Sequence, residues 1–158
     1  MEENKHLENL IAMSHEIGSN NAYVQGGGGN TSVKISDNKM AIKASGVQLK
    51  DMNFDHGIAI VDFKKVNSYH QNPDLAEDTY GETIKQFALN SEGRPSIETG
   101  FHALLGRYVI HSHSVFFNVL LCAIEGKKLI TQHFPESIWI DYHTPGKDLT
   151  VAIQNTLD

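Results

Sequence analysis

The 158-residue sequence has a single cysteine, Cys122, and therefore cannot form an intrachain disulfide. This scarcity of cysteine fits a reducing compartment. A secretory or membrane signal is also missing, because the opening stretch MEENKHLENLIAMSHEIG has acidic residues where a signal peptide needs basic ones, and charges interrupt its apolar positions. We therefore expect a cytoplasmic protein that does not bind a membrane.

Positive charge is scarce as well. The 13 Lys and Arg residues are outnumbered by 19 Asp and Glu residues, which gives a formal net charge of −6. Nucleic acids and anionic lipids attract proteins through clustered basic residues, so the composition excludes a general attraction to either. Any anion that this protein binds must be held by local groups.

The sequence contains no internal repeat or low-complexity linker, and its 40% of hydrophobic residues can form a substantial core. We expect one domain over residues 1–158. Apolar periodicity predicts helices and strands that alternate without the regular βαβ spacing of a parallel sheet, which favours an α/β sandwich with a largely antiparallel sheet. The expected helices are 4–17, 97–106, 115–124 and 147–157, with a polar, helix-like stretch over 64–91; the expected strands are 31–36, 40–45, 57–63, 108–114 and 137–142.

The first candidate for chemistry is His111-Ser112-His113, inside the expected strand 108–114. Alternate residues of a strand share a face, so the two histidines would project side by side, about 7 Å apart along the backbone. Imidazole pairs of this kind bind zinc. A pair of structural histidines in a half-buried strand explains the same spacing, and the residues alone leave both interpretations open.

Glu98 lies near the start of the expected helix that leads into the histidine strand. A carboxylate there is suited to metal binding or to acid–base catalysis, but taken alone it is explained by the favourable charge at a helix N-terminus. His102 follows one helical turn later and could pair with Glu98. We interpret His102 as structural.

The stretch QGGGGNTS, residues 25–32, enters a strand. Its four glycines allow backbone N–H groups to approach a bound anion, and Asn30 adds a polar side chain. The stretch is neither a P-loop nor a dinucleotide motif, because GxxxxGK[ST] is absent and the glycines precede a strand. Ser45 and Gly46 form a similar turn, although either feature alone is more often just a tight or flexible loop.

The motifs GGNTS, KASG, PSIE and HSHS occur in this order, and together they resemble the class II aldolase and adducin family, whose sugar-phosphate aldolases carry a GN-x-S loop, an SG or TG turn, an S-x-E helix start and an H-x-H strand. The resemblance extends from the first helix to the last residue and includes Tyr142-His143-Thr144-Pro145-Gly146, which is similar to a Y-x-x-x-G segment. It implies a three-layer α-β-α sandwich around a mostly antiparallel sheet.

The resemblance also implies an activity, namely metal-dependent cleavage of a ketose 1-phosphate by a retro-aldol reaction through a metal-stabilised enediolate. In this scheme Glu98 is the catalytic carboxylate and also approaches the metal, while His111 and His113 are two of three histidine ligands of Zn²⁺ or another divalent ion. A cytoplasmic homotetramer acting on a phosphorylated sugar is the implied form. The resemblance implies that Asn30, Ser45, Gly46 and Ser96 bind the substrate phosphate. With the backbone N–H groups of the glycine loop added, the expected phosphate site consists of Gly28, Gly29, Asn30, Ser45, Gly46 and Ser96.

Other functions compete with this one. Epimerases, dehydratases and decarboxylases of the family share the metal and the enediolate, and adducin-like members are non-catalytic modules. The presence of Glu98, His111 and His113 together argues against a non-catalytic module, which would not need these three residues. A Schiff-base aldolase using Lys43 or Lys34 has no supporting arrangement in the sequence.

The sequence departs from the family at its end. The third histidine of the family lies in an N-H-G segment after the last helix, and no such segment follows here; neither His133 nor His143 matches it. The resemblance therefore predicts a domain that is incomplete at its C-terminus. We expect the chain alone to bind metal weakly, to show little or no aldolase activity, and to associate through exposed apolar surface.

Overall fold

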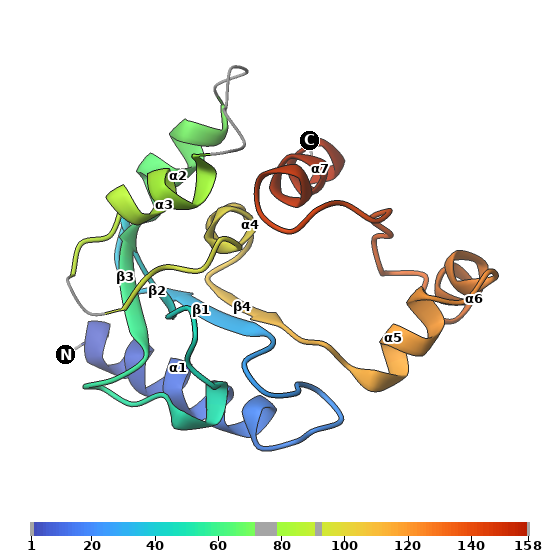
Figure 1. Ribbon diagram of the computed structural model, residues 1–158, viewed down its shortest axis with the longest axis horizontal. Helices are drawn as coiled ribbons and strands as arrows, with labels where there is room; N and C mark the ends of the chain where they lie inside the picture. Colours follow the sequence, from blue (N-terminus) through green and yellow to red (C-terminus); the bar gives the residue numbers. More distant parts are fainter. Residues whose placement is uncertain (1, 72–78, 91–92, 158) are drawn as a thin grey trace.

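The computed structural model describes residues 2–71, 79–90 and 93–157. Its centre is a four-stranded sheet in the order β3-β2-β1-β4, in which every neighbouring pair is antiparallel (Figure 1). The hairpin between β1 and β2 turns at residues 35–38, as the alternating pattern predicted. The strands are β1 (Asn30–Lys34), β2 (Lys39–Lys43), β3 (Ile58–Asp62) and β4 (Tyr108–His111).

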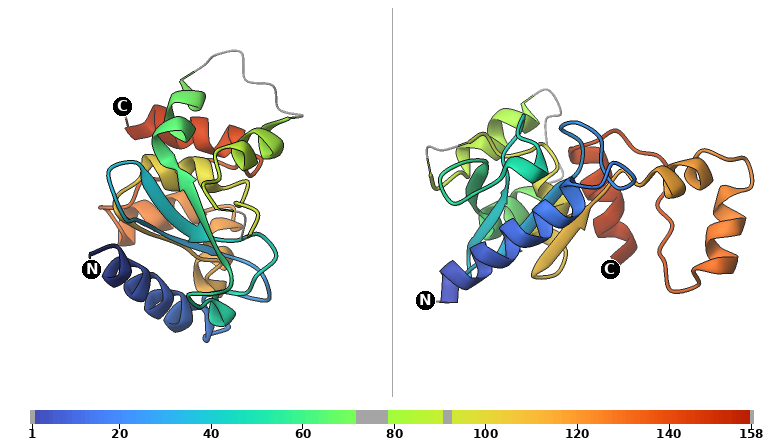
Figure 2. Two further views of the ribbon diagram at one scale, coloured as in Figure 1. Left: turned by 90° about the vertical axis from the view of Figure 1, so that its left-hand side faces the viewer. Right: turned by 90° about the horizontal axis from the view of Figure 1, so that it is seen from below.

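Helices cover both faces of this sheet. Helix α1 lies on one face and the group formed by α2, α3, α4 and α7 lies on the other, so the arrangement is the predicted three-layer α-β-α sandwich (Figures 1 and 2). The helices are α1 (Glu2–Gly18), α2 (Phe63–His70), α3 (Tyr80–Gln86), α4 (Thr99–Leu104), α5 (Val115–Leu121), α6 (Gly126–His133) and α7 (Lys147–Leu157), with a 3₁₀ turn η1 at Leu49–Asp51.

Two hydrophobic clusters follow from the alternation of the strands. In β2, Ala41 faces α1 and belongs to the cluster with Leu10 and Val33, whereas Met40 and Ile42 face the opposite layer. Because both faces of β2 are buried, the sheet is the middle layer of the core.

Helices α5 and α6 form an arm that projects away from the sheet (Figure 1). Helix α5 has the sequence VFFNVLL, yet none of its residues is buried. The side chains of Phe116 and Val119 are 62% and 67% exposed, so the arm presents a large apolar surface to solvent. No helix in the described part of the chain is both long and apolar enough to span a bilayer.

The predicted strand over 137–142 is wrong: this segment has no regular secondary structure, and α6, which the apolar pattern did not predict, precedes it. A strand forms only beside a partner that completes its backbone hydrogen bonds, and none of the described strands pairs with these residues. The polar stretch 64–91 contains two short helices, and its residues 72–78 and 91 lie outside the described residues.

Strand β4 ends at His111, earlier than predicted. Asn30 pairs with His111, so His113 would pair with Gly28 if the register continued. Gly29 has a φ of 72°, which an extended strand cannot accommodate, and the ladder ends there.

Candidate functional site

The start of α4 is fixed by the local sequence Pro95-Ser96-Ile97-Glu98. The Ser96 hydroxyl accepts a hydrogen bond from the Glu98 backbone N–H at 3.2 Å, and the Ser96 carbonyl accepts hydrogen bonds from the backbone N–H and the hydroxyl of Thr99 at 3.1 and 2.6 Å. Such serine turns satisfy the N–H groups that a helix leaves unpaired. Glu98 thereby becomes the residue immediately before α4, with its side chain directed at the sheet.

Side chains from two strands, β1 and β4, converge on one carboxylate oxygen of Glu98. The Asn30 side-chain amide donates to Glu98 Oε2, and His111 Nδ1 lies 3.2 Å from the same atom. Asn30 and His111 are directly opposite in the β1–β4 register, so they share one face of the sheet. The pairing of the two strands therefore places both partners of Glu98 side by side.

The electrostatics of Glu98 favour its ionised form. Its side chain is only 15% exposed, and burial by itself would raise the pKa of the carboxyl group. The hydrogen bond and charge of His111, together with the Asn30 amide, outweigh this effect and hold the pKa below its ordinary value. Glu98 is thus a carboxylate at neutral pH and can accept a proton.

His113 lies beyond the end of β4 but still beside His111, with the two ring centroids 4.9 Å apart. Burial lowers the pKa of His113, and the charge of His111 lowers it further, which favours the neutral imidazole. The glycine loop lies against its ring, because a Cβ at Gly28 would be 2.8 Å from His113 Nδ1. Gly28 is therefore required here for close approach.

The donor types at this place suit a divalent ion: two imidazoles and a carboxylate are ligands that zinc accepts. As the side chains lie, however, no group of three or more His, Cys, Asp or Glu residues within 2–71, 79–90 and 93–157 is arranged to hold a metal. His133 and His143, which the resemblance did not match to the third ligand, are both exposed. The chemistry of a metal site is present in His111, His113 and Glu98, while its geometry is not formed.

The turns expected to bind phosphate do lie together. Asn30 Nδ2 is 3.3 Å from Ser96 Oγ, which joins the end of the glycine loop to the start of α4. Ser45 donates its backbone N–H to the Arg94 carbonyl at 2.8 Å, and Ala44 pairs with Pro95 in an isolated bridge. Gly46, with a φ of 85°, completes the turn after β2. These contacts bring the end of the glycine loop, the turn after β2 and the segment before α4 next to one another.

Lys43, which the sequence offered only as a candidate for a Schiff base, lies beside the glycine loop. It is only 3% exposed, and its Nζ donates to the carbonyls of Gly27 at 3.2 Å and Val47 at 2.8 Å, so it links the glycine loop to the turn after β2. Burial lowers its pKa, and the negative charge of Glu98 acts in the opposite direction. The sequence signal for a buried lysine was its position at the end of the apolar strand MAIK.

His102 is fully buried and lies one turn into α4. Its Nδ1 is 2.8 Å from Ser32 Oγ, so it pairs with the sheet and not with Glu98 across the helical turn. Burial lowers the pKa of His102 to about 3, with a further contribution from the charge of His111. The ring is therefore neutral in the folded protein.

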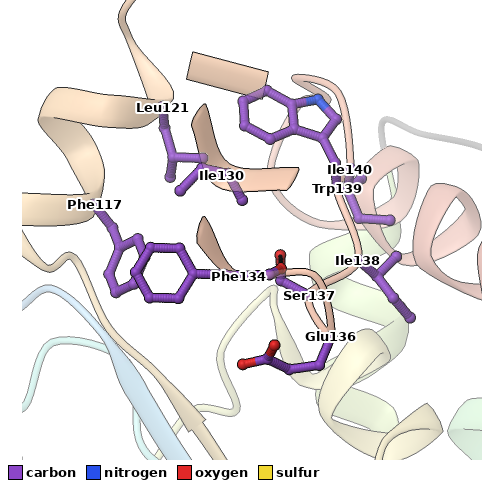
Figure 3. A pocket seen from close by; sticks show the side chains of 9 residues that line it. All are labelled: Phe117, Leu121, Ile130, Phe134, Glu136, Ser137, Ile138, Trp139 and Ile140. Carbon is purple, nitrogen blue, oxygen red and sulfur yellow. Dashed lines mark hydrogen bonds between the residues drawn. The ribbon is translucent and has the colours of Figure 1, made fainter. Parts of the chain in front are cut away.

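One further cavity, of about 260 Å³, lies in the arm and not at Glu98. Figure 3 shows its lining, in which apolar side chains from α5 and α6 face the segment 136–140. Phe117 and Phe134 meet there with ring centroids 5.3 Å apart. The cavity contains no cluster of groups suited to catalysis.

Comparison with known proteins identifies a family. Residues 8–158 match the model of the class II aldolase and adducin N-terminal domain. The sequence is 31% identical over 163 residues to the uncharacterized oxidoreductase YuxG of Bacillus subtilis (strain 168), a match that covers 94% of this chain and 23% of YuxG.

Solved structures show the same fold. The N-terminal class II aldolase domain of a conserved protein from Thermoplasma acidophilum superposes with a TM-score of 0.86 at 24% identity, covering 94% of this chain and 74% of that one. L-fuculose 1-phosphate aldolase superposes with a TM-score of 0.53 at 21% identity, covering 75% of this chain and 48% of that one. The chain therefore spans about half of the aldolase and less than a quarter of YuxG.

Proposed function

Because this chain belongs to the class II aldolase and adducin family, we propose that it forms the catalytic part of a metal-dependent aldehyde-lyase that cleaves a ketose 1-phosphate by a retro-aldol reaction. The observation that carries the proposal is the convergence of Asn30 and His111 on the carboxylate of Glu98, with His113 beside them. L-fuculose 1-phosphate aldolase, which shares the fold, is named for a substrate of this class.

In the proposed reaction Glu98 moves the proton. A retro-aldol cleavage begins when a base removes a proton from a hydroxyl group, and the lowered pKa of Glu98 keeps it ready to do so. Asn30 and His111 both contact Oε2, so the accepting oxygen has a fixed position. After the carbon–carbon bond is cleaved, the protonated Glu98 returns a proton to the carbon atom of the phosphorylated fragment at which the bond broke.

His111 and His113, with Glu98, are the residues that would hold the divalent ion, which when bound would polarise the carbonyl and hydroxyl oxygens of the sugar. His113 contributes a neutral imidazole, which is the form able to bind a metal.

The phosphate of the substrate would lie among Gly28, Gly29, Asn30, Ser45, Gly46 and Ser96. Backbone N–H groups and hydroxyls supply its hydrogen bonds. Lys43 adds the positive charge that the acidic chain otherwise lacks, because its Nζ lies between the glycine loop and the turn after β2. The contacts of Nζ with the Gly27 and Val47 carbonyls place this charge beside two of the turns of the proposed phosphate site, and this supports a binding role.

The test uses the full natural reading frame that contains this chain, purified with Zn²⁺. Incubation with L-fuculose 1-phosphate and related ketose 1-phosphates should release dihydroxyacetone phosphate, and chelation should abolish the release. Glu98→Gln is the matched variant, because it keeps the shape of the side chain without its charge. Release of an epimer, water or carbon dioxide in place of dihydroxyacetone phosphate would reject the aldolase assignment.

A further inference from the structure

Alternate residues of β1 contact α4 in a regular series. Asn30 donates to Glu98, and Ser32 Oγ lies 2.8 Å from His102 Nδ1. Lys34 then donates from its Nζ to the carbonyl of Leu105, the residue that ends the helix. Three successive side chains on one face of the strand thus hold the beginning, the middle and the end of α4.

The spacing of these contacts follows from backbone geometry. Two residues of a strand advance by about 6.6 Å, and four residues of an α-helix advance by about 6 Å. Asn30 and Ser32 are two residues apart on the strand, while Glu98 and His102 are four residues apart along the chain of the helix. Both pairs can therefore form at once without bending either element.

Helix α4 depends on such contacts for its orientation. It has only six residues, so its own hydrogen bonds give it little stability. Ser32 is 1% exposed and His102 is 0% exposed, so water cannot replace the bond between them. His102 Nε2 is also buried and has no hydrogen-bond partner, which leaves the Ser32 contact as the bond that fixes this ring.

The ring of His102 is also connected, through Phe101, to His111, the second partner of Glu98. It stacks on Phe101 with ring centroids 4.7 Å apart, and Phe101 in turn meets the edge of His111 at 5.6 Å. A shift of His102 would therefore be transmitted to His111 through Phe101.

We propose that Ser32 and His102 are positioning residues, whose mutual hydrogen bond sets the place of the Glu98 carboxylate between Asn30 and His111. The inference rests on the proposed function only because that function makes Glu98 the group that transfers the proton. The competing explanation is that the pair simply stabilises the core.

The experiment reads the position of Glu98 directly. In the 158-residue chain, the Asn30 side-chain amide proton should resonate far downfield in NMR spectra, because it donates a hydrogen bond to the Glu98 carboxylate. Ser32→Ala and His102→Gln should move this resonance back toward the position of a free amide. His102→Asn should preserve it, because the Asn side-chain oxygen lies near the place of histidine Nδ1, whereas Gln extends to the place of Nε2.

Ser14→Ala is the matched control. Ser14 Oγ is 2.6 Å from Thr31 Oγ1, so this variant removes a buried hydroxyl contact between β1 and α1, on the opposite face of the sheet. It should lower the melting temperature and leave the Asn30 resonance unchanged. If Ser32→Ala and His102→Gln lower the melting temperature and leave the Asn30 resonance in place, the pair only stabilises the core and the proposal is overturned.

A kinetic arm in the full natural reading frame separates this proposal from the function. Ser32→Ala should lower kcat by about 10-fold or more and leave KM nearly unchanged, because a misplaced carboxylate slows the proton transfer but not phosphate binding. A moved Asn30 resonance together with an active Glu98→Gln protein would uphold the positioning and reject the proposed role of Glu98. If neither Ser32→Ala nor His102→Gln folds, the folded His102→Asn protein decides the question. A shifted Asn30 resonance in this variant would show that the Nδ1 contact is not the positioning bond, and an unshifted resonance would support the proposal.

Discussion

Acidification should destabilise this protein through His102, and replacing this residue should remove that part of the pH dependence. In the folded state burial lowers the pKa of the ring to about 3, from an ordinary value of 6.5. Between these two values the unfolded chain binds a proton at this position and the folded protein does not. Stability therefore rises with pH across this window and is lost as the pH falls.

The size of the effect follows from the two pKa values. Each unit of pH within the window changes the free energy of unfolding by about 1.4 kcal/mol, so lowering the pH from about 6.5 to 4.5 should cost about 2 to 3 kcal/mol. This is a large fraction of the stability of a typical domain, about 5–15 kcal/mol.

Urea unfolding at several pH values between 4.5 and 7 measures the effect in the parent and in His102→Asn. The variant should be less stable at neutral pH but should show a flatter dependence on pH. The pKa shifts of His70 and His113 do not involve His102, so the titration of these two residues is common to both proteins and cancels in the difference. Ser14→Ala should lower stability equally at every pH, because it removes a buried hydrogen bond and no titratable group.

Parallel stability curves for the parent and His102→Asn would refute the reasoning. They would mean that His102 takes up a proton as readily in the folded protein as in the unfolded chain, which its burial beside Ser32 should prevent.

Three further predictions concern the candidate site. In the full natural reading frame, Glu98→Gln should fold normally and lower kcat by about 10²- to 10⁴-fold, and an active, well-folded variant in a cleavage assay would contradict the assignment of the proton transfer. In the chain itself, a His111→Ala/His113→Ala double variant should weaken zinc binding in a metal titration by at least about 10- to 100-fold, and unchanged affinity would place the metal elsewhere. Lys43→Met should weaken the binding of inorganic phosphate by about 10- to 100-fold in a calorimetric titration, because a hydrogen bond to a charged group contributes about 1.5–3 kcal/mol. Lys34→Met is the control and should leave phosphate binding unchanged.

The sequence determined the main elements of the fold because their signals are local. The apolar period of residues 4–17 predicted α1, and the alternation on both sides of residues 37 and 38 predicted the hairpin of β1 and β2. The spacing of the predicted helices and strands favoured an antiparallel sandwich, and the order of the four motifs indicated the family. Candidate site residues were also local signals, since a glycine loop, a serine turn and an H-x-H segment are recognisable without a fold.

The tertiary structure decided what these residues contact. The alternation of residues 137–142 predicted a strand, but a strand also needs a neighbour, and no described strand supplies one. Conversely, the rings of His111 and His113 lie together although β4 ends at His111, before the second histidine.

The roles of His102 and Lys43 likewise depended on the fold. Spacing along one helix suggested that His102 pairs with Glu98, but the structure pairs it with Ser32, which is 70 residues away. The contact of Lys43 with Val47 lies within the turn after β2, but its contact with the Gly27 carbonyl has no local signal, because the two residues meet only when the glycine loop lies beside β2. Sequence patterns report the period and chemistry of a segment, whereas a buried polar contact depends on which distant segment lies opposite.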